Sequence, residues 1–130
     1  MTRYCLGIDV GSVGSKAVIF DGARVLASRV VPSGTNYAVT AAKLKAEVLA
    51  SAGLKGSDIA ASVATGTGGG NANADGHHSV IICDARGVNF TFPQARTVIT
   101  LSASAPAEKE TFRSPLNSSA SLRKRLIAMG

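Results

Sequence analysis

The stretch that decides the fold is Gly7-Ile8-Asp9-Val10-Gly11-Ser12-Val13-Gly14-Ser15-Lys16. Residues 4–10 are mostly apolar and predict a buried strand that carries Asp9 near its end. A second apolar stretch, residues 17–20, follows the Gly/Ser turn at once. The sequence therefore predicts a tight hairpin between two strands. It does not predict a P-loop, because the glycine-rich segment of a P-loop leads into a helix.

The polar residues of this hairpin have the chemistry that a nucleotide's phosphates need. Gly11 permits the tight turn, and we expect the hydroxyls of Ser12 and Ser15 to face outward with Lys16 and with backbone N–H groups. Asp9 is positioned to bind Mg²⁺ through water, and Lys16 to neutralise phosphate charge. Spacing alone leaves one alternative open, a Gly/Ser hairpin that merely carries a surface Asp and a surface Lys.

The residues that follow predict the rest of an α/β sheet. Asp21-Gly22 is a hairpin signal into a third strand, residues 24–31. Residues 37–52 have the apolar pattern of a helix, which Gly53 would cap. Residues 59–64 then predict a fourth strand of the same sheet.

Beyond residue 76 the pattern predicts one more helix and one more strand. Residues 77–86 have the length and apolar content of a buried helix, although their β-branched run, residues 80–82, could equally be a strand. Phe90, Phe92 and Pro93 predict a connection, and residues 96–101 a strand. The expected order is β-β-β-α-β-α-β.

Residues 65–76, between these elements, are rich in glycine. For residues 66–70 we favour a flexible turn over a phosphate cradle, because no helix starts immediately after them. His77 and His78 are interpreted as solvated polar residues and not as half of a metal site, because adjacent residues do not share a helix face.

Composition limits the classes of protein to consider. The 130 residues are 45% hydrophobic and 17% charged, which indicates one small domain or part of one and excludes disorder by composition. The longest apolar runs, such as residues 80–83, are far shorter than the roughly 20 residues of a membrane span. With no signal-like N-terminus and two separated cysteines, Cys5 and Cys83, we expect a cytoplasmic protein with reduced thiols.

The last residues differ from the rest. Residues 102–130 are rich in Ser, Ala and Arg, and we expect a tail that is disordered or forms a short helix at residues 121–129. The expected domain is therefore residues 1–101. The net charge is +6, but the basic run at residues 123–125 is too short to track phosphates along a strand. We expect no nucleic-acid partner.

Three further blocks follow the hairpin: Val63-Ala64-Thr65-Gly66, Ala85-Arg86-Gly87-Val88 and Pro93-Gln94-Ala95-Arg96-Thr97-Val98-Ile99. Together these blocks resemble the BadF/BadG/BcrA/BcrD ATPase family, within the actin-like ATPase superfamily. That family includes ATP-binding subunits of benzoyl-CoA reductase and activators of 2-hydroxyacyl-CoA dehydratases. The resemblance, over residues 4–99, is in particular to the smaller ATPase subunit of benzoyl-CoA reductase.

The resemblance implies the N-terminal lobe of a ribonuclease-H-like fold. It implies ATP and Mg²⁺ as cofactors, with contacts from Asp9, Gly11, Ser12, Ser15 and Lys16. It also implies that a pair of homologous ATPase subunits hydrolyses ATP to drive an electron from a shared [4Fe-4S] cluster to a reductase or dehydratase partner. For benzoyl-CoA reductase the setting is anaerobic aromatic degradation.

The sequence departs from the family pattern after Ile99, where Thr100-Leu101-Ser102 stands in place of Asp-Ile-Gly. Asp84 stands where many members carry a His, and residues 68–70 lack the Arg of activator members. The family's cluster cysteines and adenosine-binding glycines lie beyond this point, and Cys83 is not a cluster ligand by position.

These departures predict a truncated lobe with little activity alone, for which a frameshift near Ile99 is one explanation. We assign no catalytic residue. Two alternatives stay open: a binding or assembly module without hydrolysis, and a lobe of a sugar or pantothenate kinase.

Overall fold

The computed structural model describes residues 3–100, 110–113 and 128–129. It divides into two compact units, Met1–His78 and Ser79–Gly130, and each is described by itself. The division falls inside residues 1–101, which the sequence predicts as one lobe. The boundary expected at residue 101 stays a prediction.

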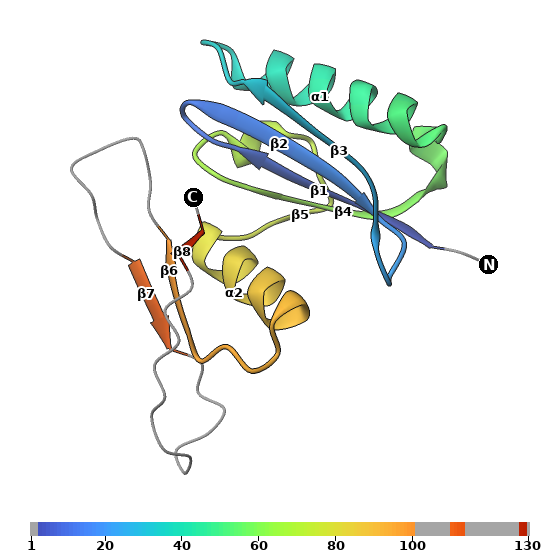
Figure 1. Ribbon diagram of the computed structural model, residues 1–130. Coiled ribbons are helices and arrows are strands. Elements are labelled where there is room, and N and C mark those ends of the chain that lie inside the picture. The colour runs from blue at the N-terminus through green and yellow to red at the C-terminus, as the bar shows by residue number, and fades with distance from the viewer. Residues whose placement is uncertain (1–2, 101–109, 114–127, 130) are drawn as a thin grey trace. The chain divides into compact units, whose positions relative to one another are not determined.

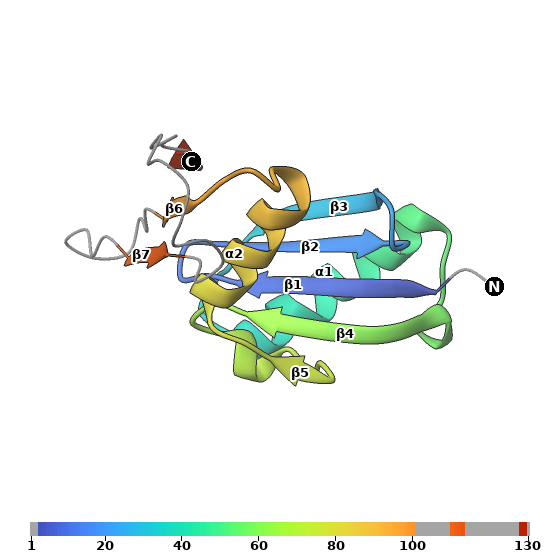
Figure 2. The ribbon, with the colours of Figure 1, turned by 90° about the horizontal axis from the view of Figure 1, so that it is seen from below.

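The first unit is a five-stranded sheet with one long helix (Figure 1). Its elements are β1 (Tyr4–Val10), β2 (Gly14–Phe20), β3 (Val25–Pro32), α1 (Tyr37–Ala52), β4 (Ile59–Thr65) and β5 (Gly76–His77). Short 3-10 helices, Gly56–Asp58 and Gly69–Asn71, precede and follow β4. The strand order is β3-β2-β1-β4-β5, as Figure 2 shows, with β1, β2 and β3 antiparallel and β4 parallel to β1.

Alternation along β1 sets the two faces of this sheet. Leu6, Ile8 and Val10 are buried, whereas Cys5 is exposed and Asp9 half-buried. Helix α1 supplies the other side of the core, which consists of Leu6, Ile8, Val10, Ala17, Ile19, Ala41, Leu44, Val48, Leu49, Ala64 and Ala72. Burying one such Leu or Val contributes about 1.5–3 kcal/mol. The hydrophobic face of the sheet thus packs against α1, and Asp9 lies on the opposite face.

Capping fixes the ends of α1. The Asn36 side chain accepts from the Val39 N–H at 3.1 Å, which satisfies one free donor of the first turn. Gly53 ends the helix at φ 67°, a left-handed conformation that costs glycine little. Both ends agree with residues 37–52 predicted from the sequence.

The turn between β2 and β3 is organised by one carboxylate. Asp21 accepts from the backbone N–H groups of Ala23 and Arg24, each at 2.9 Å. These two hydrogen bonds, and the nearby Arg24 charge, hold the pKa of Asp21 below its ordinary value of 3.8. The predicted Asp21-Gly22 hairpin is confirmed.

The second unit contains α2 (Val80–Thr91), β6 (Thr97–Thr100), β7 (Glu110–Arg113) and β8 (Ala128–Met129). Strand β6 is central, paired antiparallel to β7 and parallel to β8. Helix α2 begins after Ser79, whose hydroxyl accepts from the Ile82 N–H at 3.4 Å. It ends at Thr91, because the next residue, Phe92, precedes Pro93, and a proline disfavours helical backbone in the residue before it.

The predicted fold class and the order β-β-β-α-β-α-β are confirmed, with three differences. The structure adds β5, which has only two residues and therefore no periodic pattern. The helix expected at residues 77–86 spans Val80–Thr91, so the connection expected at Phe90 is wrong. In the described part of the chain no helix is long and apolar enough to cross a membrane.

The third difference lies in the predicted tail. Two of its segments are strands, β7 and β8, because both edges of β6 offer backbone groups that pair with them. The helix expected at residues 121–129 is therefore wrong at Ala128–Met129. Residues 121–127 lie outside the described residues.

Candidate functional site

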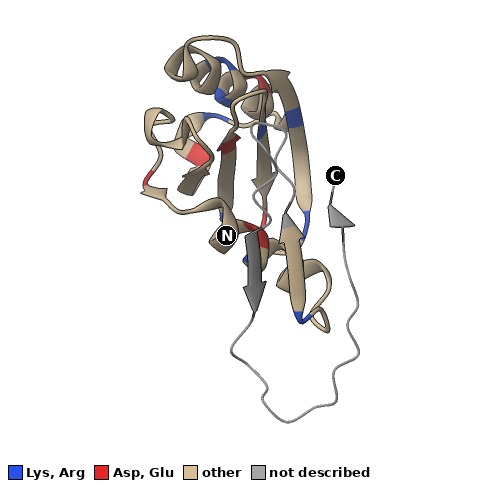
Figure 3. Cartoon of the chain, turned by 90° about the vertical axis from the view of Figure 1, so that its left-hand side faces the viewer, with Lys and Arg blue, Asp and Glu red and all other residues tan. Residues whose placement is uncertain are grey.

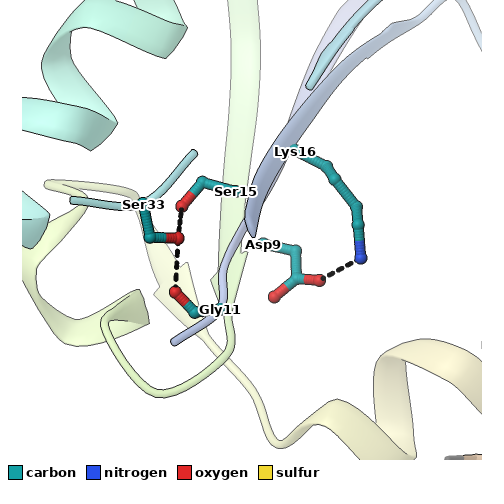
Figure 4. Close-up of polar contacts among 5 residues, drawn as sticks. All are labelled: Asp9, Gly11, Ser15, Lys16 and Ser33. Atoms are coloured by element: carbon teal, nitrogen blue, oxygen red, sulfur yellow. Dashed lines mark hydrogen bonds and ion pairs between the residues drawn. The ribbon is translucent and has the colours of Figure 1, made fainter. Parts of the chain in front are cut away.

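The β1–β2 hairpin brings Asp9 and Lys16 together. They are direct partners across the antiparallel pair, and Lys16 Nζ lies 3.5 Å from Asp9 Oδ2 (Figure 4). Their side chains are 33% and 60% exposed, so water weakens the ion pair, and a stronger anion could compete for the lysine. The carboxylate of Asp9 and the ammonium group of Lys16 therefore lie together on one face of the hairpin.

The turn between the strands requires glycine at one position. The Gly11 N–H donates to the Gly14 carbonyl at 3.2 Å, and a Cβ added at Gly11 would lie 2.6 Å from that same oxygen. A side chain here would force the turn open. Ser12 and Val13 lie at the exposed tip, with Val13 66% exposed.

The Ser15 hydroxyl does not face outward, and this expectation is wrong. Ser15 is fully buried, because it alternates with Lys16 along β2 and so faces α1. Its hydroxyl lies 2.7 Å from that of Ser33, which donates to the Gly11 carbonyl at 2.5 Å (Figure 4). Since Ser33 gives its one proton to Gly11, Ser15 donates to Ser33. Ser15 therefore supports the turn from inside.

A glycine-rich loop closes over the end of β1. Residues 66–70 form a turn, as predicted, which runs into the 3-10 helix Gly69–Asn71; the flexibility of this turn stays a prediction. The turn is attached to β1 by a hydrogen bond from the Gly68 N–H to the Val10 carbonyl at 2.8 Å. Gly66 has φ +86°, and a Cβ there would lie 2.5 Å from both Asp9 Oδ1 and the Val10 carbonyl oxygen. The loop thus approaches the Asp9 carboxylate more closely than any residue with a side chain could.

Sequence reasoning missed Thr65, the last residue of β4. It is the register partner of Asp9 in the parallel β1–β4 pair, so both side chains project from the same face. Thr65 is 9% exposed, and its Oγ1 is buried without a hydrogen-bond partner among the described residues. In the sequence, the position of Thr65 directly before the Gly-rich loop could have identified it as a candidate site residue.

The far end of the loop is held by a carboxylate with a structural role. Asp75 Oδ2 accepts from both the N–H and the hydroxyl of Ser62, each at 2.7 Å. These hydrogen bonds, and the charge of Lys45, lower the pKa of Asp75 below its ordinary value. Asp75 therefore fastens the loop to β4.

The residues around Asp9 fit a phosphate-bound Mg²⁺. Around Asp9 they offer a carboxylate, an ammonium group and an unpartnered hydroxyl, which are hard oxygen and cationic groups. The two cysteines of the chain, Cys5 on β1 and Cys83 on α2, are free thiols. Among the described residues no three His, Cys, Asp or Glu side chains form a metal-binding group, His77 and His78 included.

Charge is spread over the described part of the chain. Figure 3 shows Lys and Arg positions interspersed with Asp and Glu positions, not gathered on one element.

Comparisons with curated proteins reveal close relatives. The chain is 45% identical over 100 residues to the activator of lactoyl-CoA dehydratase from Anaerotignum propionicum, covering 75% of this chain and 38% of that protein. It is 39% identical over 104 residues to the (R)-2-hydroxyglutaryl-CoA dehydratase activating ATPase from Acidaminococcus fermentans, covering 78% and 40%. The chain thus spans about two fifths of the length of these relatives.

Comparison with solved structures identifies the same kind of protein, activators of CoA dehydratases. Component A of the Acidaminococcus fermentans (R)-2-hydroxyglutaryl-CoA dehydratase matches with a TM-score of 0.71 at 39% identity, over 77% of this chain and 39% of that one. The ADPNP-bound activator of 2-hydroxyisocaproyl-CoA dehydratase from Clostridium difficile matches with a TM-score of 0.68 at 36% identity, over 76% and 37%. A ROK hexokinase from Thermus thermophilus, at 16% identity and a TM-score of 0.58 over 84% and 46%, shares the fold alone.

A protein-family model also matches this chain. The model of the BadF/BadG/BcrA/BcrD ATPase family matches residues 6–104, a range that begins in β1 and contains both the hairpin and the Gly-rich loop. The hairpin that carries Asp9 and Lys16, the actin-like fold and the activator relatives therefore lead to one conclusion: this chain belongs to the BadF/BadG/BcrA/BcrD ATPase family.

Proposed function

We propose that this chain binds the polyphosphate of ATP, with Mg²⁺, at the β1–β2 hairpin, as the N-terminal lobe of a 2-hydroxyacyl-CoA dehydratase activator. The observation that carries the proposal is the 3.5 Å Asp9–Lys16 pair beside the turn at Gly11. The pair is accessible and lies on the sheet face opposite α1. An anionic ligand and a cation can therefore separate the two charges and bind one each.

Each hairpin residue has a distinct role in this proposal. Lys16 neutralises a phosphate oxygen, and Asp9 accepts hydrogen bonds from water on the metal. When bound, Mg²⁺ supplies positive charge that the phosphate oxygens need. Gly11 and Ser12 approach the phosphates at the exposed turn, while Ser15 acts only through the buried hydroxyl chain to the Gly11 carbonyl.

Activity beyond nucleotide binding is proposed for the whole protein. Named relatives are activators of lactoyl-CoA and (R)-2-hydroxyglutaryl-CoA dehydratases, which favours a dehydratase partner over benzoyl-CoA reductase and aromatic degradation. By family resemblance, a pair of such subunits would couple ATP hydrolysis to electron transfer from a [4Fe-4S] cluster. The resemblance places the family's cluster cysteines beyond Ile99, so we assign no step to Cys5 or Cys83.

The experiment is a calorimetric titration of Mg²⁺–ATP into the wild-type chain, Lys16→Ala and Lys43→Ala. Lys43 is the matched control, because it is also exposed and also pairs with a carboxylate, Glu47, at 3.9 Å. A charge-assisted hydrogen bond contributes about 1.5–3 kcal/mol, so Lys16→Ala should weaken binding by about 10-fold to 100-fold. Lys43→Ala should bind like wild type. Equal losses in both variants would show that only the overall charge matters.

A further inference from the structure

One polar atom near the site, Thr65 Oγ1, is buried without a hydrogen-bond partner in the part of the chain that the structure describes. Buried hydroxyls are almost always paired, so an unpaired one calls for an explanation. The residues around Thr65 suggest an explanation for this unpaired hydroxyl.

The two oxygens of the Asp9 carboxylate have different surroundings. Oδ2 faces the Lys16 ammonium group at 3.5 Å. Oδ1 lies over the turn that follows Thr65, since a Cβ added at Gly66 would come within 2.5 Å of it. Thr65 pairs with Asp9 across β1 and β4 and projects from the same face. Because β1 lies between β2 and β4, Thr65 flanks Asp9 on the side away from Lys16.

We propose that Thr65 is a positioning residue for Asp9, whose hydroxyl donates to Asp9 Oδ1 once a nucleotide phosphate draws Lys16 away. The inference rests on the nucleotide site proposed above. Without ligand, Lys16 holds the carboxylate and Thr65 stays unpaired. With ligand, the carboxylate exchanges its lysine partner for the threonine hydroxyl and is held for the hydrated metal. Gly66 permits the exchange, because no side chain separates the two groups.

The test compares Thr65→Val, Thr65→Ser and Thr67→Val by titration with ATP, in Mg²⁺ and in EDTA, and by thermal unfolding without ligand. Thr65→Val keeps the shape and removes the hydroxyl, and Thr67 is an exposed position of the same loop. Thr65→Val should weaken Mg²⁺–ATP binding by about 10-fold to 100-fold, the effect of one hydrogen bond to a charged group. Metal-free ATP binding should change by less than about twofold, because Asp9 acts on the metal side.

Two further results separate positioning from a structural role. The melting temperature of Thr65→Val should be no lower than that of wild type, since the variant removes an unpaired hydroxyl. Thr65→Ser should restore Mg²⁺–ATP binding, and Thr67→Val should match wild type throughout.

A lower melting temperature, equal losses with and without Mg²⁺, or no rescue by serine would each overturn the inference. Unchanged Mg²⁺–ATP binding in Thr65→Val would overturn it while leaving the nucleotide site intact. If the wild-type chain does not bind Mg²⁺–ATP, the proposed function fails, and the role of Thr65 fails with it.

Discussion

Replacing Gly66 by alanine should destabilise the first unit by about 2–5 kcal/mol, for two separable reasons. The backbone at Gly66 has φ +86°, and a left-handed conformation costs a residue with a Cβ about 1–2 kcal/mol. The new Cβ would also lie 2.5 Å from the Val10 carbonyl oxygen and from Asp9 Oδ1. Relieving such overpacking costs about 1–3 kcal/mol more.

Two other glycines isolate these contributions. Gly22 has φ +97° and open space around it, so Gly22→Ala should cost only the conformational part, about 1–2 kcal/mol. Gly70 has neither a positive φ nor a neighbour within 4 Å, so Gly70→Ala should change stability by less than about 1 kcal/mol. The three variants carry the same chemical change in the same chain.

The assay is urea unfolding followed by circular dichroism, with the midpoint compared at equal slope. Stability should rank wild type and Gly70→Ala first, then Gly22→Ala, then Gly66→Ala. If Gly66→Ala were as stable as Gly22→Ala, the close approach of the loop to Asp9 would be refuted.

Two more changes test the supports of the hairpin and of the loop. Ser33→Ala leaves the buried Ser15 hydroxyl without its acceptor and should cost about 2–4 kcal/mol, whereas exposed Ser28→Ala should stay within about 0.5 kcal/mol in the same urea assay. The pKa of Asp75 is lowered by its hydrogen bonds from Ser62, so its stabilisation is full above the ordinary value of 3.8 and is lost as pH falls through the lower folded-state value. In Asp75→Asn, the free energy of unfolding should therefore fall less steeply below pH 3.8 than in wild type, as a series of urea unfolding curves at different pH would show. The same pH dependence in the variant and wild type would contradict this role of Asp75.

The first unit could largely be predicted from sequence because its signals are local. Asp21-Gly22 specifies a turn by its own hydrogen bonds, and Gly53 specifies a helix end by its left-handed backbone. Strand alternation likewise places Asp9 and Lys16 on one face. These features depend on residues close together in the chain.

The parts that were missed depend on contacts between distant segments. Ser15 sits in a Gly/Ser turn sequence that suggests exposure, but its direction is set by strand register and by a partner, Ser33, that lies 18 residues away. Thr65 lies next to Asp9 only because β4 pairs in parallel with β1. Likewise, strands β7 and β8 form on the edges of β6 and not from a pattern of their own.

The central claim is that Asp9 binds a metal-bound nucleotide at the β1–β2 hairpin. The most direct measurement is the affinity of wild type and of Asp9→Asn for ATP, by calorimetry, with Mg²⁺ and with EDTA. Asp9→Asn should weaken Mg²⁺–ATP binding by about tenfold or more, because the carboxylate charge serves the hydrated cation. It should not weaken metal-free binding, because the carboxylate competes with phosphate for Lys16. Equal Mg²⁺–ATP affinity in the two proteins, or no binding by wild type at millimolar nucleotide, would contradict the account.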